Sequence, residues 1–336
     1  MAELQLESVV DVHAHLWQTT LGGHRYFSDE ALQGWVSKFG LGEEVPVDVD
    51  AGQLIEALDR AEAALDVRRY TICVFAIDLR PRFTMSVPLP QLNDWVMAQA
   101  ARDQRGRILP FACMNPLLPE ALPEVHRCAQ LGARGFKLYP PTGFYPDDPA
   151  ALAFYEAVLQ AQQDSGRTLP VLVHQGFSYS GSKYAQPVRL EEVAARFEPD
   201  LQLIAAHAGI PWTDEAVWVS SIHPNVYLDI SLFGDVVGFW PELHARLFAL
   251  AKRAGALERV LFGTDWPLSA LWLNDQCEPT WANLHQIVDA VASVKVPDHL
   301  LEQGLPAITS EEIIGVLARN AGALFGSLDD PEPATR

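Results

Sequence analysis

The chain alternates short apolar segments with longer amphipathic ones, and this alternation most constrains what it can fold into. The apolar segments are rich in β-branched residues and end in a polar residue or in a turn containing Gly or Pro, as buried strands do. Because they are apolar throughout, they indicate a parallel sheet covered by helices. The eight predicted strands are Val9–His13, Tyr70–Ile77, Ile108–Met114, Gly135–Tyr139, Pro170–His174, Gln202–His207, Asn225–Ile230 and Arg259–Gly263.

The segments between these strands have helical periodicity. In Asp50–Leu65, for example, Leu54, Leu58 and Leu65 fall on one helical face. The other predicted helices are Leu92–Arg102, Pro119–Leu131, Pro149–Ser165, Leu190–Phe197, Ala216–Ile222, Pro241–Ala254 and Ser310–Leu324. Strand–helix alternation of this length predicts a (β/α)8 TIM barrel, although an open doubly wound sheet has the same local pattern.

The domain organisation follows from the same pattern. We expect residues 1–328 to form a single barrel domain and the Pro- and Asp-rich segment 329–336 to be a flexible tail. Two connections are long: Trp17–Val49 after the first strand and Trp266–Thr309 after the eighth. Both insertions lie where a barrel enzyme carries the loops that cover its active site.

Charge and cysteine content restrict the partners and the compartment. The 24 Lys and Arg against 43 Asp and Glu give a net charge of −19, which disfavours nucleic acid and anionic membranes and leaves a small-molecule substrate. The four cysteines lack CxxC spacing, which indicates reduced thiols. The N-terminus has no basic region followed by a long apolar run, so we expect a cytoplasmic protein.

Polar side chains close several of the predicted strands, where barrel enzymes collect their chemistry. In the first strand, Asp11, His13 and His15 alternate with apolar residues and are expected to share one face. An isolated pair of histidines is more often packed than metal-bound. However, His174 closes the fifth strand and His207 the sixth in the same way. The recurrence indicates a site assembled from several strands.

The eighth strand adds a carboxylate, Asp265, and the ordered set of strand ends then resembles a known family. The motifs are HAH (13–15), VHQG (173–176), AHAG (206–209) and FGTDWP (262–267), with GFKLYP (135–140) and NAGALFG (320–326) in addition. In this order they resemble the amidohydrolase superfamily, specifically its amidohydrolase-related branch of TIM-barrel hydrolases and decarboxylases. The resemblance covers nearly the whole chain.

The resemblance implies a divalent metal held by His13, His15, His174 and Asp265, with His207 beside the metal as a further candidate ligand. Neutral imidazoles and a carboxylate suit zinc best, and manganese or iron are alternatives. Lys137 is another candidate ligand, because in binuclear relatives the lysine of the fourth strand is carbamylated and bridges two ions. As an unmodified lysine, it would pair with Asp265 or with a substrate carboxylate.

The same resemblance implies catalytic roles for Asp265 and His207. A metal lowers the pKa of a bound water to about 7. Asp265 would take a proton from that water and pass it to the leaving group, and His207 would polarise the carbonyl under attack. Asp11 would either orient an imidazole or serve as a buried partner of backbone or of an arginine.

Other residues provide weaker signals. His24 lies in the first insertion and could reach the pocket, whereas packing or surface roles are expected for His126, His223, His244, His285 and His299. An aromatic barrel mouth, and with it an apolar or aromatic substrate, is suggested by Trp17, Phe144, Tyr145, Phe177, Tyr179, Trp212 and Trp266.

The leading functional hypothesis is hydrolysis of a carboxylic ester, lactone, amide or thioester. The alternative is non-oxidative decarboxylation of an aromatic or unsaturated acid, whose carboxylate would be bound by cations such as Arg25, Arg80, Arg82 or Lys183. A hypothesis of another class is a non-catalytic metal-binding barrel. The resemblance to the family also suggests a homodimer. The sequence contains no GxSxG elbow, Walker loop or GxGxxG motif.

Overall fold

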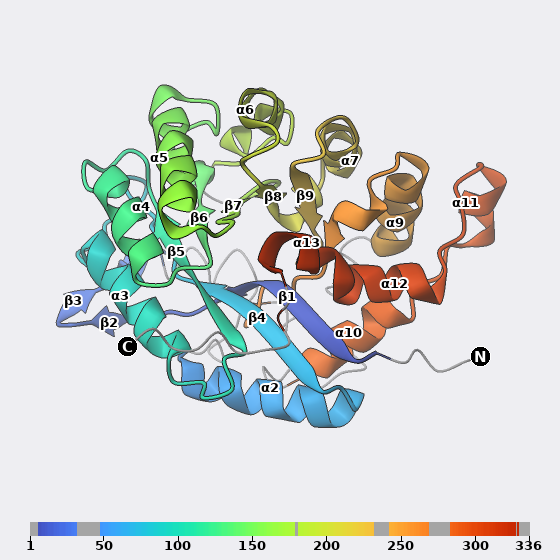
Figure 1. Cartoon of the computed structure of the whole chain (residues 1–336), viewed down its shortest axis with the longest axis horizontal. Coiled ribbons are helices and arrows are strands. Elements are labelled where there is room, and N and C mark those ends of the chain that lie inside the picture. Colours follow the sequence, from blue (N-terminus) through green and yellow to red (C-terminus); the bar gives the residue numbers. More distant parts are fainter. Residues whose placement is uncertain are drawn as a thin grey trace.

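In the computed structural model, eight parallel strands form one sheet whose order follows the chain (Figure 1). The structure describes residues 6–31, 48–178, 181–231, 242–268, 283–326 and 328. The strands of the sheet are β1 (Ser8–His15), β4 (Arg69–Phe75), β5 (Ile108–Met114), β6 (Gly135–Leu138), β7 (Val171–Val173), β8 (Leu203–Ala205), β9 (Val226–Asp229) and β10 (Val260–Leu261). The strand positions predicted from apolar periodicity are confirmed.

Backbone hydrogen bonds join the two ends of this sheet. Val12 N donates to Phe262 O at 2.9 Å, and Asp265 N donates to His13 O at 2.8 Å. The first strand therefore lies against β10 and the residues that follow it. These contacts curl the sheet into a nearly closed barrel, so the predicted TIM barrel is confirmed and the open doubly wound sheet is not.

Helices that alternate with the strands or follow the last strand surround the barrel (Figure 1). They are α2 (Ala51–Leu65), α3 (Leu89–Ala100), α4 (Ala121–Gln130), α5 (Pro149–Ser165), α6 (Arg189–Phe197), α7 (Thr213–Ile222), α9 (Leu243–Arg253), α10 (Leu284–Ala292), α11 (Asp298–Glu302), α12 (Ser310–Leu317) and α13 (Gly322–Phe325). In the described ranges, no helix is long and apolar enough to cross a membrane.

Local sequence sets the helix starts. Asp50 Oδ1 accepts from Gln53 N at 3.3 Å, and Gln53 Oε1 accepts from Asp50 N at 2.9 Å, which forms a capping box at the start of α2. Thr309 and Glu312 form the same box before α12. These boxes satisfy amide groups that a helix N-terminus leaves without partners, so both helices begin where the sequence predicts.

The last predicted helix, Ser310–Leu324, is wrong as a continuous element, because α12 ends at Leu317 and a short 3-10 turn (Arg319–Ala321) separates it from α13. The turn points Asn320 at the start of β10, where its Nδ2 donates to Leu257 O and Val260 O at 3.0 and 2.8 Å. Two backbone carbonyl groups receive hydrogen bonds in this way, and the helix is interrupted at the turn that allows them.

The connection after the eighth strand is more than an insertion over the active site. Its described part contains α10, which packs against α2 and α12 in the outer layer of the barrel. The first insertion contains a short hairpin of β2 (Thr20–Leu21) and β3 (His24–Arg25). Parts of both insertions, at 32–47 and 269–282, lie outside the described residues, as does the predicted tail at 329–336.

The barrel interior is filled by apolar side chains from several strands. Val10, Val12, Leu109, Ile204 and Leu261 belong to one buried cluster. α13 closes the barrel at the amino ends of the strands, where the Phe325 ring lies 6.1 Å from that of Phe111. Such a filled interior leaves the opposite end of the barrel, at the carboxyl ends of the strands, as the place for a site.

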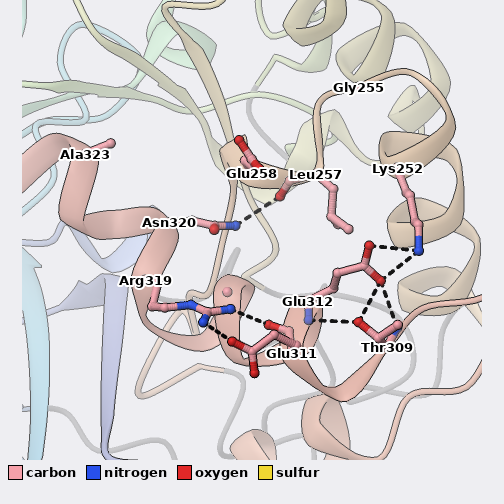
Figure 2. Close-up of a pocket in the computed structure, with 11 residues that line it drawn as sticks. Lys252, Gly255, Leu257, Glu258, Thr309, Glu311, Glu312, Arg319, Asn320 and Ala323 are labelled. Atoms are coloured by element: carbon pink, nitrogen blue, oxygen red, sulfur yellow. Dashed lines mark hydrogen bonds and ion pairs between the residues drawn. The ribbon is translucent and has the colours of Figure 1, made fainter.

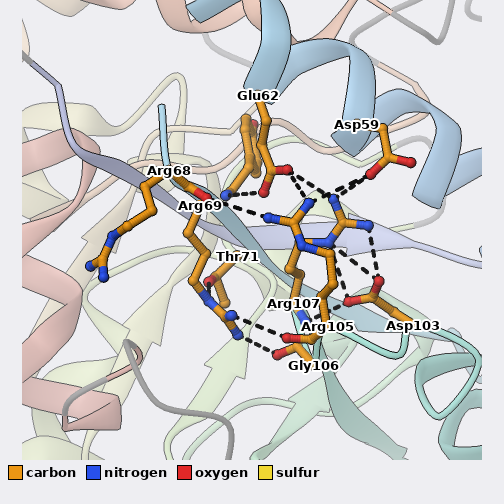
Figure 3. Close-up of polar contacts among 10 residues, drawn as sticks. Asp59, Glu62, Arg68, Arg69, Thr71, Asp103, Arg105, Gly106 and Arg107 are labelled. Carbon is orange, nitrogen blue, oxygen red and sulfur yellow. Dashed lines mark hydrogen bonds and ion pairs between the residues drawn. The ribbon is translucent and has the colours of Figure 1, made fainter. Parts of the chain in front are cut away.

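A buried ion-pair network ties together the N-terminal ends of β4 and β5 (Figure 3). Arg107, which directly precedes β5, is 1 % exposed and lies 2.9 Å from Asp103 and 3.1 Å from Glu62 of α2. Burial alone would raise the pKa of Asp103, but its hydrogen bonds with Arg107 hold that pKa below the ordinary value. The charges in this network thus depend on one another.

Replacing Arg107 is therefore expected to be costly. Arg107→Met removes the cation paired with buried Asp103, leaves Glu62 with Arg105, and should lower the free energy of unfolding by about 3–5 kcal/mol, measured by urea denaturation. Arg60→Met, which removes an exposed pair with Glu56, serves as the control and should cost about 0.5 kcal/mol or less. Equal losses in the two variants would contradict the network's role.

Candidate metal centre

Three buried polar side chains meet at the carboxyl end of the barrel. His13 and His15 come from the end of β1, and Asp265 follows β10. His15 Nε2 lies 2.9 Å from Asp265 Oδ1 and 3.3 Å from His13 Nε2, which is itself 3.3 Å from Asp265 Oδ1. One ligand atom from each residue thus faces the same small volume.

A change of phase in β1 turns the two histidines into the barrel. Val10 and Val12 already point inward, so strict alternation would place His13 outside. The register of β1 against β4 shifts between Asp11 and Ala14, as in a β-bulge, and this shift brings His13 and His15 to the interior. Bulges commonly re-aim side chains next to active sites.

This phase change makes the expectation for Asp11 wrong. Asp11 does not share a face with the histidines; its Oδ1 accepts from the backbone N of His13 at 3.0 Å and of Thr264 at 3.1 Å. Thr264 Oγ1 also donates to Asp11 Oδ2 at 2.7 Å. Burial raises the pKa of Asp11 to about 7, although these hydrogen bonds oppose the rise. Asp11 is thus a backbone partner, which was the second of its two predicted roles.

His174 and His207 lie beside the first cluster. His174 follows β7 and His207 follows β8, and His207 Nε2 lies 3.2 Å from His174 Nδ1. The His13 and His207 ring centroids are 4.9 Å apart, which joins this second pair to the first. The structure therefore brings together all five residues expected at the metal, as a group of three with an adjacent pair.

Backbone geometry supports a functional role for this region. His207 and Asp265 have φ values of 55° and 59°, in the left-handed region that residues with a Cβ rarely adopt. Such backbone conformations cost about 1–3 kcal/mol each and cluster at functional sites. Both strained residues are among those predicted from the strand ends.

Each of three imidazoles is anchored through the nitrogen that faces away from the cluster. His13 Nδ1 lies 2.5 Å from Asp229 Oδ2, His174 Nε2 donates to Phe177 O at 3.3 Å, and His207 Nδ1 donates to Ser231 O at 3.2 Å. An acceptor at one ring nitrogen places the proton there and leaves a lone pair on the other. The inward nitrogens therefore carry lone pairs.

Burial keeps most of the imidazoles neutral. It lowers the pKa of His15 and of His207 to about 4 and that of His174 well below its ordinary value. Burial and Lys137 also lower the pKa of His13, but Asp229 outweighs them and raises it. Burial alone would raise the pKa of Asp265, but the neighbouring imidazoles of His13 and His15 hold it well below the ordinary value.

Lys137 lies at the centre of the site. It comes from β6, and its Nζ is 3.3 Å from His13 Nε2 and 4.5 Å above the Phe75 ring. Burial lowers the pKa of Lys137 to about 7, although Asp265 and Asp229 oppose that shift. A substantial fraction of this amine is therefore uncharged at neutral pH, as both metal coordination and carbamylation require.

This donor set fits a divalent metal ion. His13 Nε2, His15 Nε2 and Asp265 Oδ1 all lie within 4.8 Å of one another, yet Asp265 Oδ1 is buried and makes no hydrogen bond of good geometry in the described structure. Lone pairs and a carboxylate that face one another are stabilised by a cation between them. Imidazole nitrogens with a carboxylate are the ligands that zinc and related ions prefer.

Two contributors escaped the sequence-based prediction: Asp229, which ends β9, and Ser231 just after it. Ser231 Oγ lies 3.0 Å from His13 Nδ1 and 2.9 Å from His207 Nδ1. The signal was available, since Asp229 closes an apolar strand in the same manner as His174. It was missed because a single carboxylate at a strand end, without a recognised motif, is common outside functional sites.

Several of the weaker candidates have other roles. His24 is exposed on β3. Arg25 pairs with Asp29, and Arg80 pairs with Asp78. The expected surface positions are confirmed for His126 and His299, and the expected packed positions for His223 and His244. Among the predicted aromatics of the barrel mouth, core positions are found for Trp17, Phe144 and Trp266; Tyr179 lies outside the described residues.

The described cysteines also behave as expected. Cys73, Cys113 and Cys128 are buried and free, and burial raises the pKa of each thiol. They are therefore not nucleophiles at neutral pH. Cys277 lies outside the described part of the chain.

A hollow of about 740 Å³ at the other end of the barrel is a poorer candidate (Figure 2). It lies beside the start of β10, and four of the charged residues that line it form ion pairs: Lys252 with Glu312 at 2.8 Å, and Arg319 with Glu311. The histidine cluster instead lies at the carboxyl ends of the strands, where barrel enzymes place their active sites.

Comparison with known proteins agrees with this architecture. A family model described as amidohydrolase matches residues 10–327. No curated protein sequence matches the chain at a significant level.

Solved structures with the same fold are distant in sequence. An uncharacterised TIM-barrel protein from Bordetella bronchiseptica is 20% identical with a TM-score of 0.60, covering 94% of this chain and 98% of its own. A β-aspartyl dipeptidase from Fervidobacterium islandicum is 14% identical (TM-score 0.55; 95% and 74%). A lactonase from Listeria monocytogenes is 11% identical (TM-score 0.52; 96% and 95%).

The geometry predicts that the purified protein binds a divalent metal through these side chains. His13→Ala or His174→Ala is expected to reduce the metal bound per chain to near zero after reconstitution, measured by plasma mass spectrometry. His126→Ala, on the outer helix α4, is the control and should keep the full metal content. Full metal content in His13→Ala would remove that residue from the ligand set.

Proposed function

The chain belongs to the amidohydrolase family, and from this premise we propose that it is a divalent-metal-dependent hydrolase of small carboxylic esters, lactones, amides or thioesters. The observation that carries the proposal is the convergence of His13 Nε2, His15 Nε2 and Asp265 Oδ1, with His174 and His207 beside them. When bound, a divalent ion, for which zinc is the best fit, supplies Lewis acidity that activates water and polarises a carbonyl.

Asp265 is the proposed general base. It is ionised at neutral pH because the neighbouring imidazoles of His13 and His15 stabilise its charged form and hold its pKa well below the ordinary value. One carboxylate oxygen faces the two histidines at 3.3 and 2.9 Å. The carboxylate can take a proton from the attacking water and deliver it to the leaving oxygen, nitrogen or sulfur atom. The strained backbone at this residue fixes where the proton is received.

His207 requires a role different from the one first expected. Polarising a carbonyl needs an N–H at Nε2, but the hydrogen bond to the Ser231 carbonyl places the proton of neutral His207 on Nδ1. Its Nε2 therefore carries a lone pair that faces His174. We propose that this nitrogen binds the metal or accepts a proton near it.

Lys137 completes the charge balance of the site. As a cation it would offset Asp265 and Asp229, and as a neutral amine it can form the carbamate seen in binuclear relatives. The two groups of ligands, one with His13, His15 and Asp265 and one with His174 and His207, could hold one ion or two. An intact mass with a carbon dioxide adduct at Lys137 would favour two.

Hydrolysis is favoured over decarboxylation by the pairing of the candidate cations. A decarboxylase needs a positive group that is free to bind the substrate carboxylate. Arg25 and Arg80 are paired with Asp29 and Asp78, and Arg82 and Lys183 lie over the rings of Phe83 and Tyr184. A scaffold without catalysis is disfavoured because both a base, Asp265, and a complete set of candidate metal ligands are present.

The reaction class can be tested with a substrate panel. The panel contains esters, lactones, amides and thioesters with small apolar or aromatic acyl groups, together with aromatic and unsaturated acids assayed for carbon dioxide release. We expect hydrolysis that is lost on chelation and restored by zinc, cobalt or manganese. Carbon dioxide release without hydrolysis would favour the decarboxylase instead. Hydrolysis that survives complete metal removal would contradict the proposal.

The proposed base makes a second prediction. Asp265→Asn keeps the shape of the side chain but cannot accept a proton, so kcat per bound metal should fall by about 10²–10⁴-fold. The variant is assayed at saturating metal with its metal content measured in parallel. Near-normal turnover in metal-loaded Asp265→Asn would show that another group takes the proton.

A further inference from the structure

We propose that the end of the seventh barrel strand, formed by Asp229 and Ser231, is a positioning element that fixes the tautomer and orientation of His13 and His207. Neither residue was expected to take part from the sequence. The inference rests on the proposed function, because it concerns how two imidazoles are aimed at the metal.

Asp229 fixes the orientation of His13 through a contact with the outward ring nitrogen of that histidine. The Asp229 carboxylate is fully buried, and its Oδ2 atom lies 2.5 Å from His13 Nδ1. A carboxylate only accepts hydrogen bonds, so the proton is held on Nδ1 and the lone pair on Nε2 faces His15 and Asp265. Carboxylate partners of this kind orient a histidine ligand and increase its basicity.

Asp229 is itself held in place by the turn that follows it. Its Oδ1 accepts from Ser231 N at 2.6 Å, so both carboxylate oxygens are occupied. The Ser231 carbonyl then accepts from His207 Nδ1 at 3.2 Å, and its Oγ lies 3.0 and 2.9 Å from the Nδ1 atoms of His13 and His207. One short segment therefore anchors imidazoles that come from two different strands.

The packing around Gly263 independently supports a specific contact between the Asp229 carboxylate and the His13 imidazole. A Cβ at position 263 would lie 2.5 Å from Asp229 Oδ1 and 3.0 Å from His13 Cβ. A side chain there would therefore push Asp229 away from the imidazole. Gly263 leaves the space in which the carboxylate reaches His13.

The test compares Asp229→Ala, Asp229→Asn and Gly263→Ala with the parent. Zinc affinity is measured by competition with a chromogenic chelator, and the cobalt-substituted protein gives the visible spectrum of the site. Asp229→Ala is expected to weaken zinc binding by about 10–100-fold and to change the cobalt spectrum. Asp229→Asn, whose single carbonyl oxygen can replace only one acceptor, should fall between Asp229→Ala and the parent.

Two matched controls separate positioning from general loss of stability. Gly322→Ala adds a methyl group where no atom lies within 4 Å, and Ser220→Ala removes a buried hydroxyl that donates to Val226 O at the start of the same strand. Both should match the parent in zinc affinity and cobalt spectrum, whereas Gly263→Ala should resemble Asp229→Ala. Melting temperatures of the metal-free proteins verify that each variant is folded.

The outcomes are distinguishable from failure of the proposed function. If the parent binds zinc and folded Asp229→Ala and Asp229→Asn bind it with the parent's affinity and cobalt spectrum, the positioning role is overturned and the hydrolase proposal stands. If Gly322→Ala weakens binding as much as Gly263→Ala, the packing argument fails. If the parent itself binds no zinc or cobalt, the proposed function and this inference fail together.

Discussion

The site depends on one interaction: a hydrogen bond from the outward ring nitrogen of a buried imidazole to a fixed acceptor. His13, His174 and His207 each make this bond, with a carboxylate or a backbone carbonyl as the acceptor. Since an imidazole has two nitrogens, satisfying the outer one leaves a lone pair on the inner one. Inward lone pairs that face a carboxylate favour the binding of a cation between them. The proposed metal-dependent hydrolysis follows from that preference.

Closure of the barrel is what brings these groups together. His13 and Asp265 lie 252 positions apart in sequence, yet a backbone hydrogen bond of 2.8 Å joins them where the sheet closes. The apolar interior supports the cluster from below, and Phe75 lies under the rings of both His13 and His15. The same burial that stabilises the barrel lowers the pKa values of His15, His174, His207 and Lys137. Stability and metal affinity therefore depend on the same packing.

Much of this arrangement was predictable from the sequence, because an apolar strand that ends in a polar residue is a local pattern. The strands, the barrel and the positions of His13, His15, His174, His207 and Asp265 follow from it. The direction of the Asp11 side chain could not be predicted in this way. It depends on the register shift between β1 and β4, which leaves no trace in the alternation of apolar and polar residues along β1. Asp229 carried a visible signal, but its partner His13 is distant in sequence, and only the closed fold shows the contact.

The central claim is that a divalent ion binds between His13, His15 and Asp265. The most direct measurement is anomalous diffraction from crystals of the zinc-reconstituted protein, with data collected on both sides of the zinc absorption edge. We expect an anomalous peak within bonding distance of His13 Nε2, His15 Nε2 and an Asp265 oxygen. A peak elsewhere in the molecule, or no peak after reconstitution, would contradict it.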